Sequence, residues 1–208
     1  MALSKIQPAS MDLTDNYAFT GTNSISGAGD IEETKLATLT ASSSSTLSFT
    51  SSIDNTYNIY KFRYFDFHPQ NDGVYLSFQT STNTGSSYGV TVTSTSFVNL
   101  HNEADNDTHL GYSTTRDLAQ STSFLASTDG YGNDNDQCGA GELFLFNPSS
   151  TTFVKHWLWD DQTYNSGNYS ARSFNAGYFN TTSAINAIQF KFSGGNIDSG
   201  TIEMYGIN

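Results

Sequence analysis

The alternation of apolar and polar residues in the last segment of the chain constrains the fold more than any other feature. Between residues 188 and 192, Ile188, Phe190 and Phe192 alternate with polar side chains, and residues 201–207 alternate in the same way. Successive side chains of a strand point to opposite faces, so a period of two indicates β-structure rather than a helix. A connection rich in Gly, Asn, Asp and Ser separates the two runs. We therefore expect two paired strands joined by a turn, the second of which closes the fold.

Short segments of this kind, separated by turn residues, recur along the chain, and no helical pattern is convincing. They predict an all-β protein with one antiparallel β-sandwich over residues 31–208, in which a jelly-roll-like arrangement is expected. The strands expected within it are 34–40, 46–50, 57–67, 74–80, 88–93, 97–100, 109–113, 142–146, 152–159, 171–179, 187–192 and 201–207.

Uncharged polar side chains are expected to solvate the surface of this sandwich. The 208 residues include 29 Ser, 26 Thr and 19 Asn, but only 8 Lys and Arg against 20 Asp and Glu. The 15 Phe, 12 Tyr and 2 Trp supply an aromatic core large enough for one domain. The formal net charge of -12 argues against nucleic acid as a partner, because a protein that binds phosphates needs a basic surface.

Cysteine content and hydropathy indicate in which environment the protein is expected to occur. Cys138 is the only cysteine, so an internal disulfide is impossible. No apolar run has the length of a secretion signal or a membrane span, so we expect neither secretion by a signal peptide nor membrane insertion. A protein of this kind would leave a cell by lysis or inside a particle.

The first 30 residues differ in composition from the rest. Leu13, Tyr17 and Phe19 form one apolar cluster among Gly and polar residues, and such a segment cannot bury a core of its own. We expect residues 1–30 to form an extended arm that docks on a partner through these three side chains. A disordered tail is the alternative.

Two acidic segments contain candidate metal ligands. If residues 101–109 were extended, five ionisable side chains would share one face and could bind a divalent metal. These five are His101, Glu103, Asp105, Asp107 and His109. The segment 129–137, with Asp134 and Asp136, resembles a calcium loop in composition but lacks the glutamate of an EF-hand. Exposed polar loops are the simpler interpretation of both, and we expect no bound metal or cofactor.

No motif of catalysis is present in the sequence. Cys138 has no basic neighbour to activate it. Asp160 and Asp161 are adjacent, so on a strand they would point in opposite directions, and Glu142 could join either of them only through the tertiary fold. We therefore expect a protein that is not an enzyme.

Aromatic residues beside these aspartates suggest a surface for sugars. Tyr164 and Tyr169 lie in a polar stretch and are expected to be exposed, which makes them, with Asp160 and Asp161, the candidate glycan contacts. Trp157 and Trp159 share one strand face and are expected in the core.

Several segments resemble a known group of proteins. Residues 5–10 and 12–22, and the closing residues 193–207, resemble segments of virion proteins of marine tailed bacteriophages. Residues 57–62 and 141–150 are similar to internal strands of the same group. The resemblance implies a β-sandwich appendage of the virus particle, of the tail-fibre or head-decoration type, that is often a homotrimer. It implies no catalytic residues.

These observations lead to a ranked set of functional hypotheses. The first is a non-enzymatic structural protein of a phage virion, assembled in the host cytoplasm and released by lysis. Its arm would bind other virion proteins, and its sandwich would project as a tail-fibre or adhesin module that binds a host glycan or protein. The alternatives are a head-fibre or decoration protein on the major capsid protein, a polysaccharide-degrading enzyme carried on the particle, and a calcium lectin.

Overall fold

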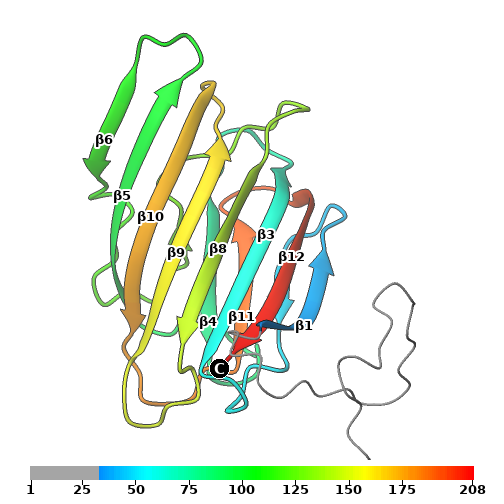
Figure 1. The fold of residues 1–208 in the computed structure, drawn as a ribbon, viewed down its shortest axis with the longest axis vertical. Coiled ribbons are helices and arrows are strands. Elements are labelled where there is room, and N and C mark those ends of the chain that lie inside the picture. Colours follow the sequence, from blue (N-terminus) through cyan, green and yellow to red (C-terminus); the bar gives the residue numbers. More distant parts are fainter. Residues whose placement is uncertain (1–32) are drawn as a thin grey trace, which may run out of the picture. The chain divides into compact units, whose positions relative to one another are not determined.

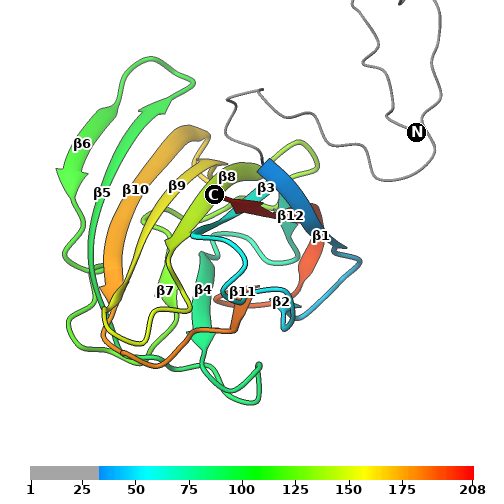
Figure 2. The same cartoon turned by 60° about the horizontal axis from the view of Figure 1, so that its bottom comes forward.

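The computed structural model describes residues 33–208, which form twelve β-strands and no helix (Figure 1). The strands belong to two antiparallel sheets that pack as a sandwich, and the larger sheet curves around the smaller one (Figure 2). In order across it, the eight-stranded sheet contains β1 (Glu33–Thr40), β12 (Ile197–Ile207), β3 (Ile59–Pro69), β8 (Gly139–Phe146), β9 (Lys155–Tyr164), β10 (Tyr169–Phe179), β5 (Val92–Asn102) and β6 (Thr108–Tyr112). The four-stranded sheet contains β2 (Leu47–Phe49), β11 (Ala187–Phe192), β4 (Leu76–Ser81) and β7 (Leu125–Ala126).

The strand order confirms the predicted jelly-roll-like sandwich. One half is β1-β12-β3-β8, the other is β2-β11-β4-β7, and the chain changes sheet at nearly every connection between these eight strands. Two neighbouring four-stranded sheets linked in this way are the pattern of a jelly roll. The hairpins β5–β6 and β9–β10 are additions, and they extend the first sheet beyond β8 (Figure 1).

The expected pairing of the last two strands is wrong. β11 lies in the small sheet between β2 and β4, whereas β12 lies in the large sheet between β1 and β3. The four residues between them, with Gly195 at φ 70°, are long enough to cross the roughly 10 Å that separates packed sheets. Ile202 and Met204 can then face the core from one side while Ile188 and Phe190 face it from the other. β12 therefore completes the interior of its sheet, because it has a partner strand on both sides.

The core is aromatic, as the composition predicts. Phe78 on β4 packs edge-on against Trp157 and Trp159 of β9, with ring centroids 5.3 Å apart in both pairs. Phe179 and Phe190 complete the cluster around the same ring. All five side chains are buried, so the prediction that both tryptophans belong to the core is confirmed.

Most predicted strands are present, with two differences. The segments 88–93 and 97–100 do not form separate strands, because β5 is continuous and pairs with β10 from Val92 to Asn102. The short strand β7 is not among the predicted ones. The predicted arm, residues 1–30 with Leu13, Tyr17 and Phe19, lies outside the described residues.

Candidate binding surfaces

The two acidic segments and the candidate tyrosines meet at one end of the sandwich. The β5–β6 turn, the β9–β10 turn and the loop before β8 lie together there, at the top of Figure 1. The hydroxyl of Tyr169 donates to Oδ2 of Asp107 at 2.8 Å, and the backbone N–H of Glu103 donates to the carbonyl of Asn168 at 3.1 Å. Nε2 of Gln137 reaches Oδ1 of Asn168 at 3.4 Å. We call the surface formed by these three loops the acidic loop end.

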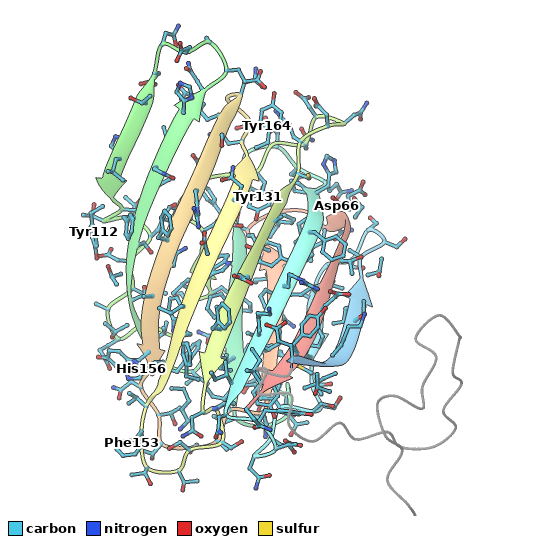
Figure 3. All side chains as sticks on the ribbon, in the orientation of Figure 1. Asp66, Tyr112, Tyr131, Phe153, His156 and Tyr164 are labelled. Atoms are coloured by element: carbon cyan, nitrogen blue, oxygen red, sulfur yellow. The ribbon has the colours of Figure 1, made fainter. Side chains whose placement is uncertain are left out.

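Carboxylates of the acidic loop end raise the pKa values of both tyrosines. Glu103 raises the pKa of Tyr164, and Asp136 and Asp134 add to this effect from the loop before β8. Asp107 raises the pKa of Tyr169 through its hydrogen bond. A negative neighbour disfavours the phenolate, so both hydroxyls remain protonated donors on a negatively charged surface. Figure 3 shows Tyr164 at this end of β9.

The five candidate ligands of the segment 101–109 do not share a face. The chain turns after Asn102, and His101 pairs with Asp105 at 3.0 Å, as residues of one turn. His101 lies opposite Thr108 across the hairpin, so His109 points to the other face of the sheet. Within residues 33–208, no three His, Cys, Asp or Glu side chains, including Asp134 and Asp136, converge as a metal site.

Asp161 is not a glycan contact, because its side chain is inside the core. It is 0% exposed, and its Oδ1 accepts the hydroxyl of Tyr64 at 2.5 Å and that of Tyr131. Nε1 of Trp159 donates to the Tyr64 hydroxyl at 2.9 Å, while Oδ2 of Asp161 has no hydrogen-bond partner among the described residues. Burial raises the pKa of Asp161 to about 7, although the two tyrosine hydroxyls act in the opposite direction.

Asp160 points away from Asp161, as the strand pattern predicts. It lies on the outer face of the large sheet, where Arg172 binds it through Nε at 2.8 Å and through a second nitrogen at 2.5 Å. Glu142 lies directly opposite Asp160 in the register of β8 and β9. Both carboxylates line two adjoining hollows of this face, with volumes of about 370 and 520 Å³. The first hollow is walled mainly by apolar side chains, and the second contains Arg63 and Arg172.

The outer face of the large sheet also carries an apolar patch that the sequence interpretation missed. Phe97 and Phe174 stack on it with centroids 4.9 Å apart, and the Arg172 guanidinium lies 4.5 Å from the Phe174 centroid. A sequence signal was present, because Trp157, Leu158 and Trp159 make that strand apolar on both faces. Residues of this kind on both faces indicate a strand that is covered on both sides.

Comparison of the chain with protein-family models, with curated proteins and with solved structures found no match. The described part of the chain contains no helix that is long and apolar enough to cross a membrane. Burial raises the pKa of the Cys138 thiol, and the nearby Asp66 acts in the same direction. A thiol in this environment is a poor nucleophile.

Proposed function

We propose that this protein is a non-enzymatic structural protein of a tailed-phage virion, and that its sandwich is a host-attachment module. The observation that carries the proposal is the acidic loop end. Loops far apart in the sequence place Tyr164 beside Glu103 and Tyr169 beside Asp107, on the two faces of the tip of the β9–β10 hairpin. The resemblance of residues 193–207 to phage appendage proteins agrees with this role.

The chemistry of the acidic loop end suits a neutral or basic glycan. Tyrosine rings offer an apolar face to sugar C–H groups, and their hydroxyls supply a polar handle at the same position. Carboxylates are strong acceptors for the hydroxyls of a sugar. Asp160 and Asp161 take no part in this surface, because the first pairs with Arg172 on the sheet and the second is buried.

The proposal also assigns a role to residues 1–30 in attaching the protein to the virus particle. Residues 1–30 would dock on other virion proteins through Leu13, Tyr17 and Phe19, in a homotrimeric appendage that is released by host lysis. A decoration or head-fibre protein on the major capsid protein would use the same arm. Antibody labelling of intact particles distinguishes these two locations.

Binding of the purified protein to host cells and to a panel of their surface glycans tests the attachment role. We expect Tyr169→Ala and Tyr164→Ala to lower binding at least tenfold while the thermal unfolding temperature changes little. Tyr178→Ala is the matched control, because Tyr178 lies at the opposite end of β10 from Tyr169. Equal binding by all four proteins would refute the assignment of this surface, and absence of binding by the wild type would refute attachment.

A particle-borne polysaccharide-degrading enzyme is the second candidate, because the fold places Glu142 opposite Asp160 on an open face. Two carboxylates across a cleft are what glycoside hydrolysis requires. Release of oligosaccharides by the wild type, but not by Glu142→Gln or Asp160→Asn, would establish this activity in place of the structural role.

A further inference from the structure

Exposed apolar side chains are concentrated on one face of one sheet. Within residues 33–208, the exposed large hydrophobic side chains are Phe65, Phe97, Leu110, Tyr112, Leu158 and Phe153. All but Phe153 lie on the outer face of the large sheet, the face toward the viewer in Figure 1, as the strand registers show. Clusters of this kind on a soluble protein mark interaction surfaces, whereas single exposed apolar residues do not.

One part of this face lies on the edge strand of the sheet. Among residues 33–208, strand β6 has no neighbour on its far side, and it carries Leu110 and Tyr112, which are 74% and 54% exposed. Tyr112 lies opposite Phe97 in the register and Leu110 lies opposite Asn99, so both point outward. Figure 3 shows Tyr112 at this edge. We call Leu110 and Tyr112 the knob.

Another part of the same face is hollowed. The apolar hollow of about 370 Å³ is walled by Phe97, Phe144, Leu158 and Phe174, and the small side chain of Ala176 leaves space at its base. Its centre on β9 and β10 is two to three strands from the knob, which is about 10–14 Å at the usual strand spacing. The knob therefore cannot fill the hollow of its own chain, because both are built on one sheet.

The charges around this patch are partly compensated within the chain. Asp160 is held by Arg172 in a two-point ion pair, and the hydroxyl of Tyr112 donates to Asp117 at 2.9 Å. Glu142, at the border of the hollow, lies opposite Arg63 in the register of β3 and β8, but Arg63 forms its ion pair with Glu203. A second chain of net charge -12 can approach here with less repulsion than at the acidic loop end.

The size of the patch is sufficient for association. It spans five strands, from β8 to β6, and three rows of outward side chains, which is about 24 Å by 20 Å. That gives on the order of 500 Å² on each copy, or about 1,000 Å² in total, the lower limit for a specific interface.

We infer that the outer face of β8, β9, β10, β5 and β6 is a self-association surface, in which the knob of one copy inserts into the apolar hollow of a second copy. A two-fold axis between two copies would match the knob of each copy with the hollow of the other, which gives a closed dimer. This inference does not depend on the virion setting.

The mass of the full-length protein, measured by sedimentation or light scattering at 1–100 µM, tests the inference. We expect the wild type to be an oligomer, and Leu110→Lys or Leu158→Glu to raise its dissociation constant at least a hundredfold. Phe153→Glu is the matched control, because Phe153 is 70% exposed but lies in the loop between β8 and β9, away from this face. Figure 3 shows it at the far end of the strands. We expect this variant to associate like the wild type.

The double variant Leu110→Lys with Leu158→Glu tests the knob-in-hollow contact itself. The introduced lysine of one copy would meet the introduced glutamate of the other, so association should recover at low salt and weaken again at high salt. Circular dichroism verifies that the variants fold, which is expected because exposed sites of this kind tolerate substitution. A monomeric wild type at 100 µM, single variants that associate normally, or a double variant that stays monomeric would each overturn the inference.

Discussion

Replacement of Asp161 by asparagine is expected to change how the stability of this protein depends on pH. Asp161 is fully buried and accepts hydrogen bonds from Tyr64 and Tyr131 on one oxygen, while the other oxygen has no partner within residues 33–208. Burial raises its pKa from 3.8 to about 7. The folded protein therefore holds a proton on this carboxyl over a pH range in which the unfolded chain has released it.

The sign of the effect follows from proton linkage. Below pH 3.8 both states are protonated at this carboxyl, and above about pH 7 both are ionised. Between these limits the free energy of unfolding falls as the pH rises, because the folded state binds more protons than the unfolded state. A difference of about three pH units between the two pKa values corresponds to about 4 kcal/mol of stability lost between pH 4 and pH 7. The introduced asparagine is neutral in both states, so the Asp161→Asn variant should lack this loss.

Urea unfolding of the wild type and the Asp161→Asn variant at several pH values between 4 and 9 measures the difference. Between pH 4 and pH 8, we expect the free energy of unfolding of the variant to rise by about 4 kcal/mol relative to that of the wild type. An unpaired buried NH₂ costs about 1–3 kcal/mol at every pH, so it shifts the difference without changing its slope. Asp160→Asn is the matched control, because Asp160 lies next in sequence on the outer face and is only a minor cause of the raised pKa of Asp161, so this variant should retain most of the wild-type slope. A difference between wild type and Asp161→Asn that does not vary with pH would refute the reasoning.

Three further predictions concern packing and surface charge. Phe78→Ala should lower the free energy of unfolding by about 3–5 kcal/mol in the same urea assay, because its ring contacts both core tryptophans; a loss below about 1 kcal/mol would contradict this packing. Gly141→Ala should cost about 1–3 kcal/mol, because the added Cβ would meet the Asp160 carbonyl oxygen and the Tyr64 hydroxyl, whereas Gly194→Ala has space and should be nearly neutral. The pKa of Glu203 is lowered to about 2, mainly by hydrogen bonds from Tyr205 and Arg63. Its stabilising contribution should therefore be present above pH 4.5 and disappear as the pH falls toward 2, so Glu203→Gln should lower the free energy of unfolding at neutral pH and remove this part of the acid sensitivity.

Local alternation is sufficient to predict the strands and the faces of their side chains. Trp157 and Trp159 are buried as expected, and the adjacent Asp160 and Asp161 do point in opposite directions. This success has a simple physical basis, since successive side chains of a strand must leave it on opposite sides. Alternation does not say which face is buried, however. The charge of Asp161 predicts a surface position, but this residue follows Trp159 by two and shares its buried face.

The pairing of strands, and the contacts between side chains far apart in the sequence, could not be predicted in the same way. β11 and β12 are neighbours in sequence with matching patterns, yet they lie in different sheets, because each finds its hydrogen-bonding partners far along the chain. The acidic loop end is another example. Asp107 and Tyr169 are 62 residues apart and meet only because β5 and β10 pair along their full length.

The sequence by itself determined an all-β sandwich with an aromatic core and a polar, acidic surface, because periodicity and composition act residue by residue along each strand. The tertiary structure decided which carboxylates and aromatic rings lie beside one another. It buried Asp161, joined Tyr169 to Asp107, and placed Leu110 and Leu158 on one outer face. Those contacts depend on strand order and register across the large sheet, and both are set by non-local hydrogen bonds and packing.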